Sequence, residues 1–383
     1  MPDASSATTP TLEGIEPHPH ARAVLLPALA AGTPSHAYLF HGPGGTGKRT
    51  VARAFAAALL CEGEPDPEQA RDRVRRGSHP DLTWVTPSGA SELLVGDVDE
   101  AVIGAVAHTP FQSSRRVFVI EAAGTMNDQA ANRLLKTLEE PPPFAHLILL
   151  AEHREDVLPT VASRCQAVRF DPLAGETVRE RLLAADPQLD PQRADACARL
   201  SGGDARLAAR LAGEEGAVLR GAAQTFARAA LAGNLSERPW SALLDSAKAA
   251  GVEAGAATAA RVSEQAELLP ARERRRHERE GSEAVRRAER RARTTTLQEA
   301  LRLCELWLRD AWCTASGAPE LVLAVDRLPE LGEDGKTRAA EDLRTGVEQV
   351  RDTRLRLALN VSEELALEAL AYRLAAQAAI SAG

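Results

Sequence analysis

A glycine-rich stretch near the N-terminus has the residue types and the spacing of a phosphate-binding loop. Residues 42–48 read GPGGTGK, which fits the pattern G-x-x-x-x-G-K, and they follow an apolar run and open an alanine-rich helical pattern in HAYLFHGPGGTGKRTVARAFAAALLC (36–61). Glycines let successive N–H groups point at phosphate oxygens, the helix adds its positive N-terminal end, and the lysine reaches the outer phosphates. The candidate nucleotide-binding residues of this loop are Gly42, Gly44, Gly45, Thr46, Gly47 and Lys48.

The residue after the lysine removes the usual magnesium ligand. A nucleotide hydrolase places Ser or Thr there, whereas this chain has Arg49, whose guanidinium cannot ligate a metal. Thr50 lies one residue further, and one residue on a helix is about 100° of rotation, so its hydroxyl is expected to point elsewhere. Thr50 stays a candidate nucleotide contact. The pattern leaves open whether ATP or ADP binds, and it does not favour a firmly held magnesium ion.

A second acidic element of a hydrolase should end the third strand, where the sequence reads VFVIEAAGTMN (117–127). An active site would place one acid on the magnesium shell and a second acid beside it to polarise the attacking water. Glu121 is a candidate for the first, but the next residue is Ala122. A general base contributes about 10² to 10⁴ in rate. Its absence favours a structural strand over a hydrolytic one.

Short apolar runs alternate with amphipathic helical patterns between residues 12 and 170. The expected strands are AYLFH (37–41), DLTWVT (81–86), RVFVIE (116–121), HLILLA (146–151) and QAVRF (166–170). Continuous apolar strands separated by helices are typical of a parallel sheet that is covered on both faces. The sequence thus predicts an α/β phosphate-loop domain with a five-stranded parallel sheet over 12–170. Residues 1–11 are rich in Ser, Thr and Pro and are expected to be disordered.

The strand pattern ends after residue 170, and helical spacing takes over. A small helical domain is predicted over 171–216, with AGEEGAVL (212–219) either a linker or the start of the next helix. An all-helical domain is predicted over 217–383. It contains a charged run at 271–296 that should form one or two long helices with Gly281 as a candidate break. The stretches GAPELVL (317–323) and RLPELGEDG (327–335) are expected to be breaks before two closing helices.

The composition bounds the class of protein. The chain has 383 residues, 44% of them hydrophobic and 26% charged, and a formal net charge of −8 that gives no global reason to expect nucleic acid or an anionic membrane. Its 5 cysteines are dispersed without a C-x-x-C pair, which favours a reducing compartment and argues against zinc. The start has no secretion-signal pattern, and no apolar run approaches the roughly 20 residues of a membrane span. We therefore expect a cytoplasmic protein.

One segment carries a specific family resemblance. NRLLKTLEEPPPFAHLILLAEHREDVLPTVASRCQAVRF (132–170) closely resembles the clamp-loader branch of the AAA+ ATPases, and SHPDL (78–82) and the loop region match the same branch. LNVSEELALEAL (359–370) resembles the closing helix of bacterial clamp-loader subunits. The resemblance implies an AAA+ domain, a helical lid and a helical collar that joins subunits. The branch often carries a four-cysteine zinc module. Here the corresponding span holds only Cys61, which we expect to be a buried core residue.

The resemblance also implies partners. They are the motor subunits (gamma/tau) and the delta subunit of a hetero-pentameric loader within the DNA polymerase III holoenzyme. The sliding clamp and primed DNA are reached through that complex, and no membrane is involved. The family contacts DNA mainly through its ATPase domains.

Within this branch, motor subunits carry GKT in the loop, an Asp-Glu pair on the third strand and a Thr after the fourth strand. This chain has Arg49 in the loop, Glu121 followed by alanine, and Glu152 where that Thr would lie. The three departures resemble the stationary member of the loader, which is not expected to hydrolyse ATP.

Two arginines receive roles from the resemblance. Arg164, in Ser163-Arg164-Cys165, corresponds to the catalytic arginine finger that enters the neighbouring subunit's ATP site, where a guanidinium is worth about 10³ to 10⁵ in rate. Arg206 lies where the lid of this family places a nucleotide-sensing arginine. The plainer alternatives are a surface salt bridge for Arg164 and a structural role for Arg206.

Three alternatives remain open from the sequence. The chain could be an active gamma/tau-like ATPase subunit, with Thr50 and Glu121 replacing the missing groups, or a phosphate-loop kinase or regulator outside replication. The basic run from Arg272 to Arg293 could contact DNA phosphates, but its interleaved glutamates favour a solvated helix face.

Overall fold

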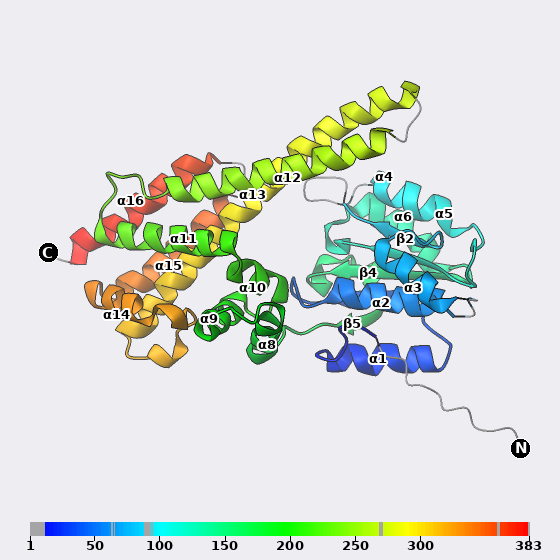
Figure 1. Ribbon diagram of the computed structural model, residues 1–383, viewed down its shortest axis with the longest axis horizontal. Coiled ribbons are helices and arrows are strands. Elements are labelled where there is room, and N and C mark those ends of the chain that lie inside the picture. The colour runs from blue at the N-terminus through cyan, green and yellow to red at the C-terminus, as the bar shows by residue number, and fades with distance from the viewer. Residues whose placement is uncertain are drawn as a thin grey trace, which may run out of the picture. The chain divides into compact units, whose positions relative to one another are not determined.

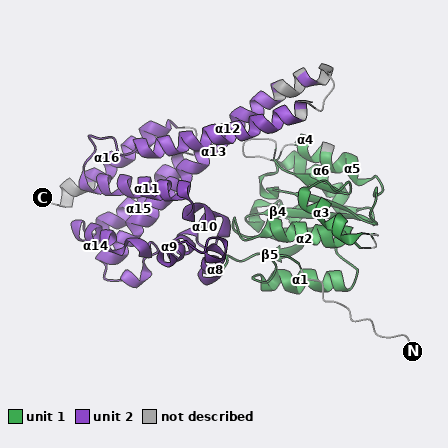
Figure 2. Ribbon diagram, in the orientation of Figure 1, with its two compact units in different colours: residues 1–173 green, residues 174–383 purple. Residues whose placement is uncertain are grey.

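The computed structural model divides into two compact units, residues 1–173 and residues 174–383 (Figure 2). It describes residues 12–62, 64, 66–87, 93, 95–267, 271–357 and 361–381. The segment 1–11, expected to be disordered, and residues 359 and 360 of the closing motif lie outside this range. The division of residues 171–383 into a lid (171–216) and a collar (217–383) stays a prediction.

The first unit is built on a five-stranded sheet with the order β2-β3-β4-β1-β5, in which every pairing is parallel. The strands are β1 (Ala37–His41), β2 (Leu82–Val85), β3 (Arg116–Ile120), β4 (Ala145–Ala151) and β5 (Gln166–Arg169). Each lies within one residue of the run that the sequence predicts. The predicted α/β fold class with a parallel sheet is confirmed.

Helices cover both faces of this sheet (Figure 1). The helical segments of the first unit are α1 (Pro19–Ala30), α2 (Lys48–Leu60), α3 (Pro67–Arg76), α4 (Val95–Val98), η1 (Asp99–Ile103), α5 (Gly104–Val106), η2 (Ala123–Thr125), α6 (Asp128–Glu139), η3 (Arg154–Asp156) and α7 (Pro159–Ala162). In β1, Tyr38 and Phe40 join the core that includes α1 and α2, while Leu39 joins the core that includes α6. Alternate residues of β1 are buried on opposite faces of the sheet, and the sequence of the strand is therefore apolar at nearly every position.

Every secondary-structure element described in the second unit is a helix. Its segments are α8 (Gly175–Ala185), α9 (Pro191–Ser201), α10 (Ala205–Ala212), α11 (Glu214–Ala232), α12 (Ser241–Glu267), α13 (Ala271–Ala315), η4 (Pro319–Leu321), η5 (Val325–Arg327), α14 (Leu328–Thr337), α15 (Ala340–Leu357) and α16 (Glu363–Ser381). The stretch 212–219, left open by the sequence, is mainly the first turns of α11. In the described part of the chain, every helix is too short or too polar to span a bilayer.

The charged run belongs to a single long helix, one of the two predicted forms, and the candidate break at Gly281 does not occur. α13 runs through it without interruption and packs along α12 (Figure 1). A Cβ at Gly281 would lie only 2.2 Å from Cγ1 of Val262 on α12. The glycine therefore permits a close approach between the two helices. The sequence alone does not show this, because glycine inside a helical pattern is usually interpreted as a break.

The stretch 327–335 is also misread as a break, because it forms most of α14. Pro329 lies in the first turn of that helix, where a missing N–H costs nothing. Gly335 packs against α13, since a Cβ there would lie 2.3 Å from Oγ1 of Thr314. Proline and glycine here start and pack a helix, and three helical segments rather than two close the chain.

Candidate functional site

The loop between β1 and α2 has the backbone shape of a phosphate loop. Gly45 and Gly47 have φ values of 64° and 96°, a region that favours glycine. Gly42 has a φ of 147°, and a Cβ there would lie 1.9 Å from the carbonyl oxygen of Phe170. Gly44 is half-buried in the same turn, and Gly47 is the N-cap of α2. The helix N-terminus therefore faces the loop, as the sequence pattern predicts.

Lys48 lies inside the loop that it would serve. Its side chain is mostly buried, and Nζ donates hydrogen bonds to the carbonyl oxygens of Gly42 at 2.5 Å and Pro43 at 2.6 Å. The buried Thr46 hydroxyl donates to the same Pro43 oxygen at 3.0 Å. The loop is thus curled around its own ammonium group, and a phosphate would have to compete with these carbonyls for it.

A salt bridge stands at the point where a magnesium site would be needed. Arg49 Nη2 lies 2.8 Å from Oε1 of Glu121, and the same oxygen accepts a hydrogen bond from Nε1 of Trp84 at 2.5 Å. Arg53 lies over the Trp84 ring, 4.8 Å from its centre. The Glu121 side chain is only 15% exposed, so these neighbours leave little of it for an ion.

The residues present at this point do not fit magnesium. The ion prefers about six oxygen ligands in near-octahedral geometry, and Oε1 of the Glu121 carboxylate is already engaged by the Arg49 guanidinium and the Trp84 indole. Thr50 is exposed and lies beside Gly14, where a Cβ would come within 3.3 Å of Cγ2 of Thr50.

The position of a water-activating base is also altered. Ala122, two residues after the end of β3, has a φ of 51°, an uncommon conformation for a residue other than glycine. A methyl group cannot accept a proton there. At the end of β4, Glu152 is exposed, and its carbonyl oxygen accepts a hydrogen bond from the N–H of Gly42 at 3.0 Å. Glu152 thus contributes its backbone to the loop, and its side chain is left to solvent.

Arg164 follows the short helix α7 and is 36% exposed. Its Nη2 lies 2.5 Å from Oε1 of Glu139 at the end of α6, and Nη1 donates to the carbonyl oxygen of Thr160 at 2.9 Å. Glu139 is 48% exposed, and ion pairs of this exposure contribute about 0 to 1 kcal/mol. The local contact is therefore weak enough for the guanidinium to exchange it for a stronger anionic partner.

Arg206 belongs to the second unit and is exposed in the first turn of α10. Asp204 caps that helix by accepting a hydrogen bond from the N–H of Leu207 at 2.8 Å. The helix start is thus secured without Arg206, which weakens the structural alternative for that arginine.

Trp84 and Arg53 lie beside the Arg49–Glu121 salt bridge, although the sequence analysis did not identify them as candidate site residues. Arg53 follows Arg49 by four residues on α2, so both arginines lie on one side of the helix. Trp84 occupies β2, in register with Val119 of β3. The i, i+4 arginine pair beside a strand tryptophan is the signal that could have revealed them.

Cys61 is 7% exposed at the end of α2, and burial raises the pKa of its thiol. Its predicted place in the core is confirmed. Within the described residues, no cluster of three or more His, Cys, Asp or Glu side chains could hold a metal ion.

Comparison with known proteins identifies relatives of the first unit. The family model described as DNA polymerase III, delta subunit, matches residues 18–174. The DNA polymerase III subunit delta' of Bacillus subtilis is 38% identical over 160 residues, which are 40% of this chain and 47% of that protein. The delta' subunit of Pseudomonas aeruginosa is 36% identical over 186 residues, 47% of this chain and 56% of that protein. The match thus spans about half the length of these relatives.

Two further similarities concern other subunits. The gamma/tau subunit of Mycobacterium tuberculosis (strain H37Rv) is 34% identical over 173 residues, 43% of this chain and 29% of that protein. The crystal structure of a gamma subunit-related protein from Thermotoga maritima superposes with a TM-score of 0.44 and 16% identity, covering 93% of this chain and 99% of that one.

Proposed function

Because the chain belongs, through residues 18–174, to the delta-prime family of DNA polymerase III clamp-loader subunits, we propose that it completes a clamp loader without hydrolysing ATP itself. In this proposal it is the stationary member of a hetero-pentamer with gamma/tau and delta subunits. The complex opens the ring-shaped sliding clamp and places it on primed DNA.

One observation carries the absence of hydrolysis: the guanidinium of Arg49 lies 2.8 Å from the Glu121 carboxylate, where a motor subunit would hold magnesium. Without the ion, charge on the transferring phosphoryl group has no metal to neutralise it. Ala122 adds the loss of the base. If ADP or ATP enters the loop, the helix N-terminus and Lys48 hold it without magnesium.

The purified chain tests this part directly. We expect no ATP turnover above that of a Lys48→Ala variant, with or without primed DNA. ATP turnover by the wild type that disappears in Lys48→Ala would instead support the gamma/tau-like alternative. The 34% identity to a gamma/tau subunit is the reason to test that alternative.

Arg164 is the group by which the chain acts on ATP, in the site of a neighbouring motor subunit. Its exposure and its weak pairing with Glu139 support this role, because the side chain can extend outward at little cost. A guanidinium at a transferring phosphoryl group is worth about 10³ to 10⁵ in rate.

A reconstituted loader tests the trans role. Arg164→Ala should lower DNA-stimulated ATP turnover by at least tenfold while the five subunits still assemble. The matched control is Glu139→Ala, which removes the local partner of Arg164 and should leave turnover intact. Unchanged ATP turnover in Arg164→Ala would exclude the proposed trans role. Equal losses of turnover in Arg164→Ala and Glu139→Ala would indicate that the Arg164–Glu139 salt bridge has a structural role instead.

The C-terminal helices offer a surface for the other subunits. Four large apolar side chains are exposed on α15, on α16 and just before α16, namely Leu355, Val361, Leu365 and Tyr372. Leu365 and Tyr372 are seven residues apart, so they lie on one face of α16. Exposed apolar groups concentrated on one face are typical of protein interfaces. Leu365→Glu should therefore weaken assembly in size-exclusion chromatography with the partner subunits.

A further inference from the structure

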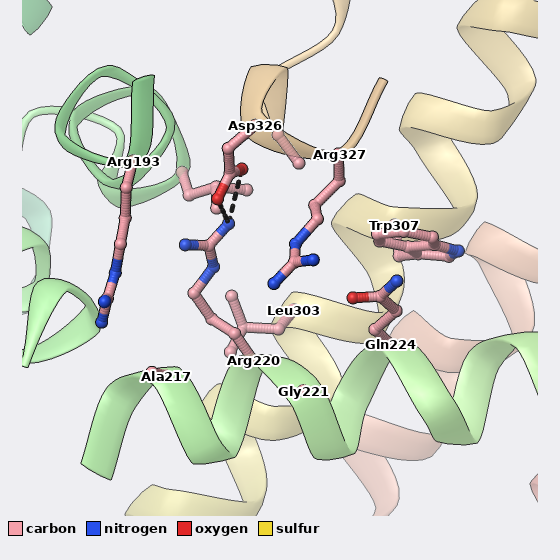
Figure 3. A pocket seen from close by; sticks show the side chains of 11 residues that line it. Arg193, Ala217, Arg220, Gly221, Gln224, Leu303, Trp307, Asp326 and Arg327 are labelled. Atoms are coloured by element: carbon pink, nitrogen blue, oxygen red, sulfur yellow. Dashed lines mark hydrogen bonds and ion pairs between the residues drawn. The ribbon is translucent and has the colours of Figure 1, made fainter. Parts of the chain in front are cut away.

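The second unit contains a pocket of about 130 Å³ with an unusual gathering of arginines around it (Figure 3). Arg193 comes from α9, Arg220 from α11 and Arg327 from η5. Leu303 and Trp307 of α13 supply apolar surface to the same pocket. Three arginines from three separate elements therefore line one small pocket, which none of the site residues discussed above lines.

The charges at the pocket do not balance. The carboxylate among its lining residues is Asp326, and both of its oxygens are engaged by Nη2 of Arg220 at 2.8 and 2.9 Å. Each member of this pair is 12% exposed. The Arg193 guanidinium donates to the carbonyl oxygens of Ala212 at 2.7 Å and Gly213 at 3.2 Å, neither of which carries a net charge. Three cations against one anion leave a lining charge of +2.

Arg327 has the weakest anchor of the three. Its side chain is 47% exposed, and its carboxylate partner is Glu330, 3.4 Å away outside the pocket lining. An exposed pair of this kind contributes about 0 to 1 kcal/mol. Arg327 can thus turn to an anion in the pocket with little loss, while the Arg220–Asp326 pair fixes the wall beside it.

A glycine keeps the space open. Gly221 lines the pocket from the interior of α11, and a Cβ at this position would meet no heavy atom within 4 Å. Glycine inside a helix costs about 0.5 to 1 kcal/mol relative to alanine. In the same helix, Gly216 has a packing reason, since a Cβ there would lie 2.0 Å from the carbonyl oxygen of Arg210. Gly221 has no such neighbour, and the volume that it frees belongs to the pocket.

We propose that this pocket binds the phosphate group of a small molecule. A phosphate monoester carries about −1.5 to −2 charges at neutral pH, which matches the excess of +2, whereas a single carboxylate would neutralise only half of it. Guanidinium forks bind phosphate oxygens in pairs of parallel hydrogen bonds. Leu303 and Trp307 leave room for an apolar portion beside the phosphate.

Inorganic phosphate is the probe, and isothermal titration calorimetry of the full chain is the measurement. The titration is done on the wild type and on Lys48→Ala, because the phosphate loop of the first unit is a second anion site. Acetate and sulfate at equal ionic strength are the comparison ions. We expect phosphate binding to persist in Lys48→Ala and to exceed acetate binding by at least tenfold.

Two variants of the pocket locate the binding. Gly221→Leu fills the space without changing charge and should abolish it, and Arg327→Gln should weaken it about tenfold, the effect of losing a charge-assisted hydrogen bond. Arg344→Gln, an exposed arginine on α15, is the control and should bind like the wild type. Loss in Lys48→Ala alone, equal binding in Gly221→Leu, or equal affinity for acetate would each overturn the proposal.

Discussion

The ion pair between Arg49 and Glu121 supports a quantitative prediction, because the absence of hydrolysis depends on it. The perturbations are Arg49→Met, which keeps an apolar stem, Glu121→Gln, and the double variant. The N–O distance of 2.8 Å favours a strong contact, but Arg49 is 53% exposed, so water screens much of the attraction. Exposed pairs contribute about 0.2 to 1 kcal/mol, and the 15% exposure of Glu121 places this pair at the upper end, about 1 kcal/mol.

Urea unfolding of the four proteins gives this coupling energy as a double-mutant cycle. Trp84 offers a local signal, since its indole donates to the same carboxylate oxygen and its fluorescence should change when Arg49 or Glu121 is replaced. The Arg49→Met variant should lose about 1 to 2 kcal/mol, which corresponds to a melting shift of about 2 to 8 °C for a unit of this size. A coupling energy indistinguishable from zero, with unchanged tryptophan emission, would refute a guanidinium in the metal position.

Three further predictions concern the framework. Asp81→Ala should destabilise the first unit by about 3 kcal/mol or more in urea unfolding, because this buried carboxylate accepts backbone N–H groups of residues 111, 112 and 113; a loss below about 1 kcal/mol would contradict the bonding. Gly281→Ala should cost about 1 to 3 kcal/mol by overpacking against Val262, with relief in a Val262→Ala background; no relief would point to another cause. Burial lowers the pKa of His146, so the folded form resists protonation and stability should fall as the pH drops below about 6.5; His146→Gln should flatten that dependence between about pH 7.5 and 5.5, and an unchanged slope would exclude His146 as its source.

Local pattern predicted the first unit well because its signals act over short distances. Parallel strands that are buried on both faces must be apolar at every position, so runs such as 145–151 stand out from the helices around them. A glycine loop between strand and helix has few other uses, and its positive φ angles agree with the residue type. The candidate break at Gly281 and the error at residues 327–335 arose where glycine and proline serve packing or helix starts.

The sequence by itself determined that Arg49 had replaced a hydroxyl ligand and that Ala122 could not act as a base, because both conclusions follow from side-chain chemistry alone. The tertiary structure decided which side chains Arg49 contacts. Arg49 lies beside Glu121 and Trp84, which are 72 and 35 residues away in the sequence. In the second unit, Arg193, Arg220 and Arg327 line one pocket although they come from distant parts of the sequence. Such contacts depend on how helices and strands pack against each other, and the spacing of residues along the sequence does not give the distances between packed elements.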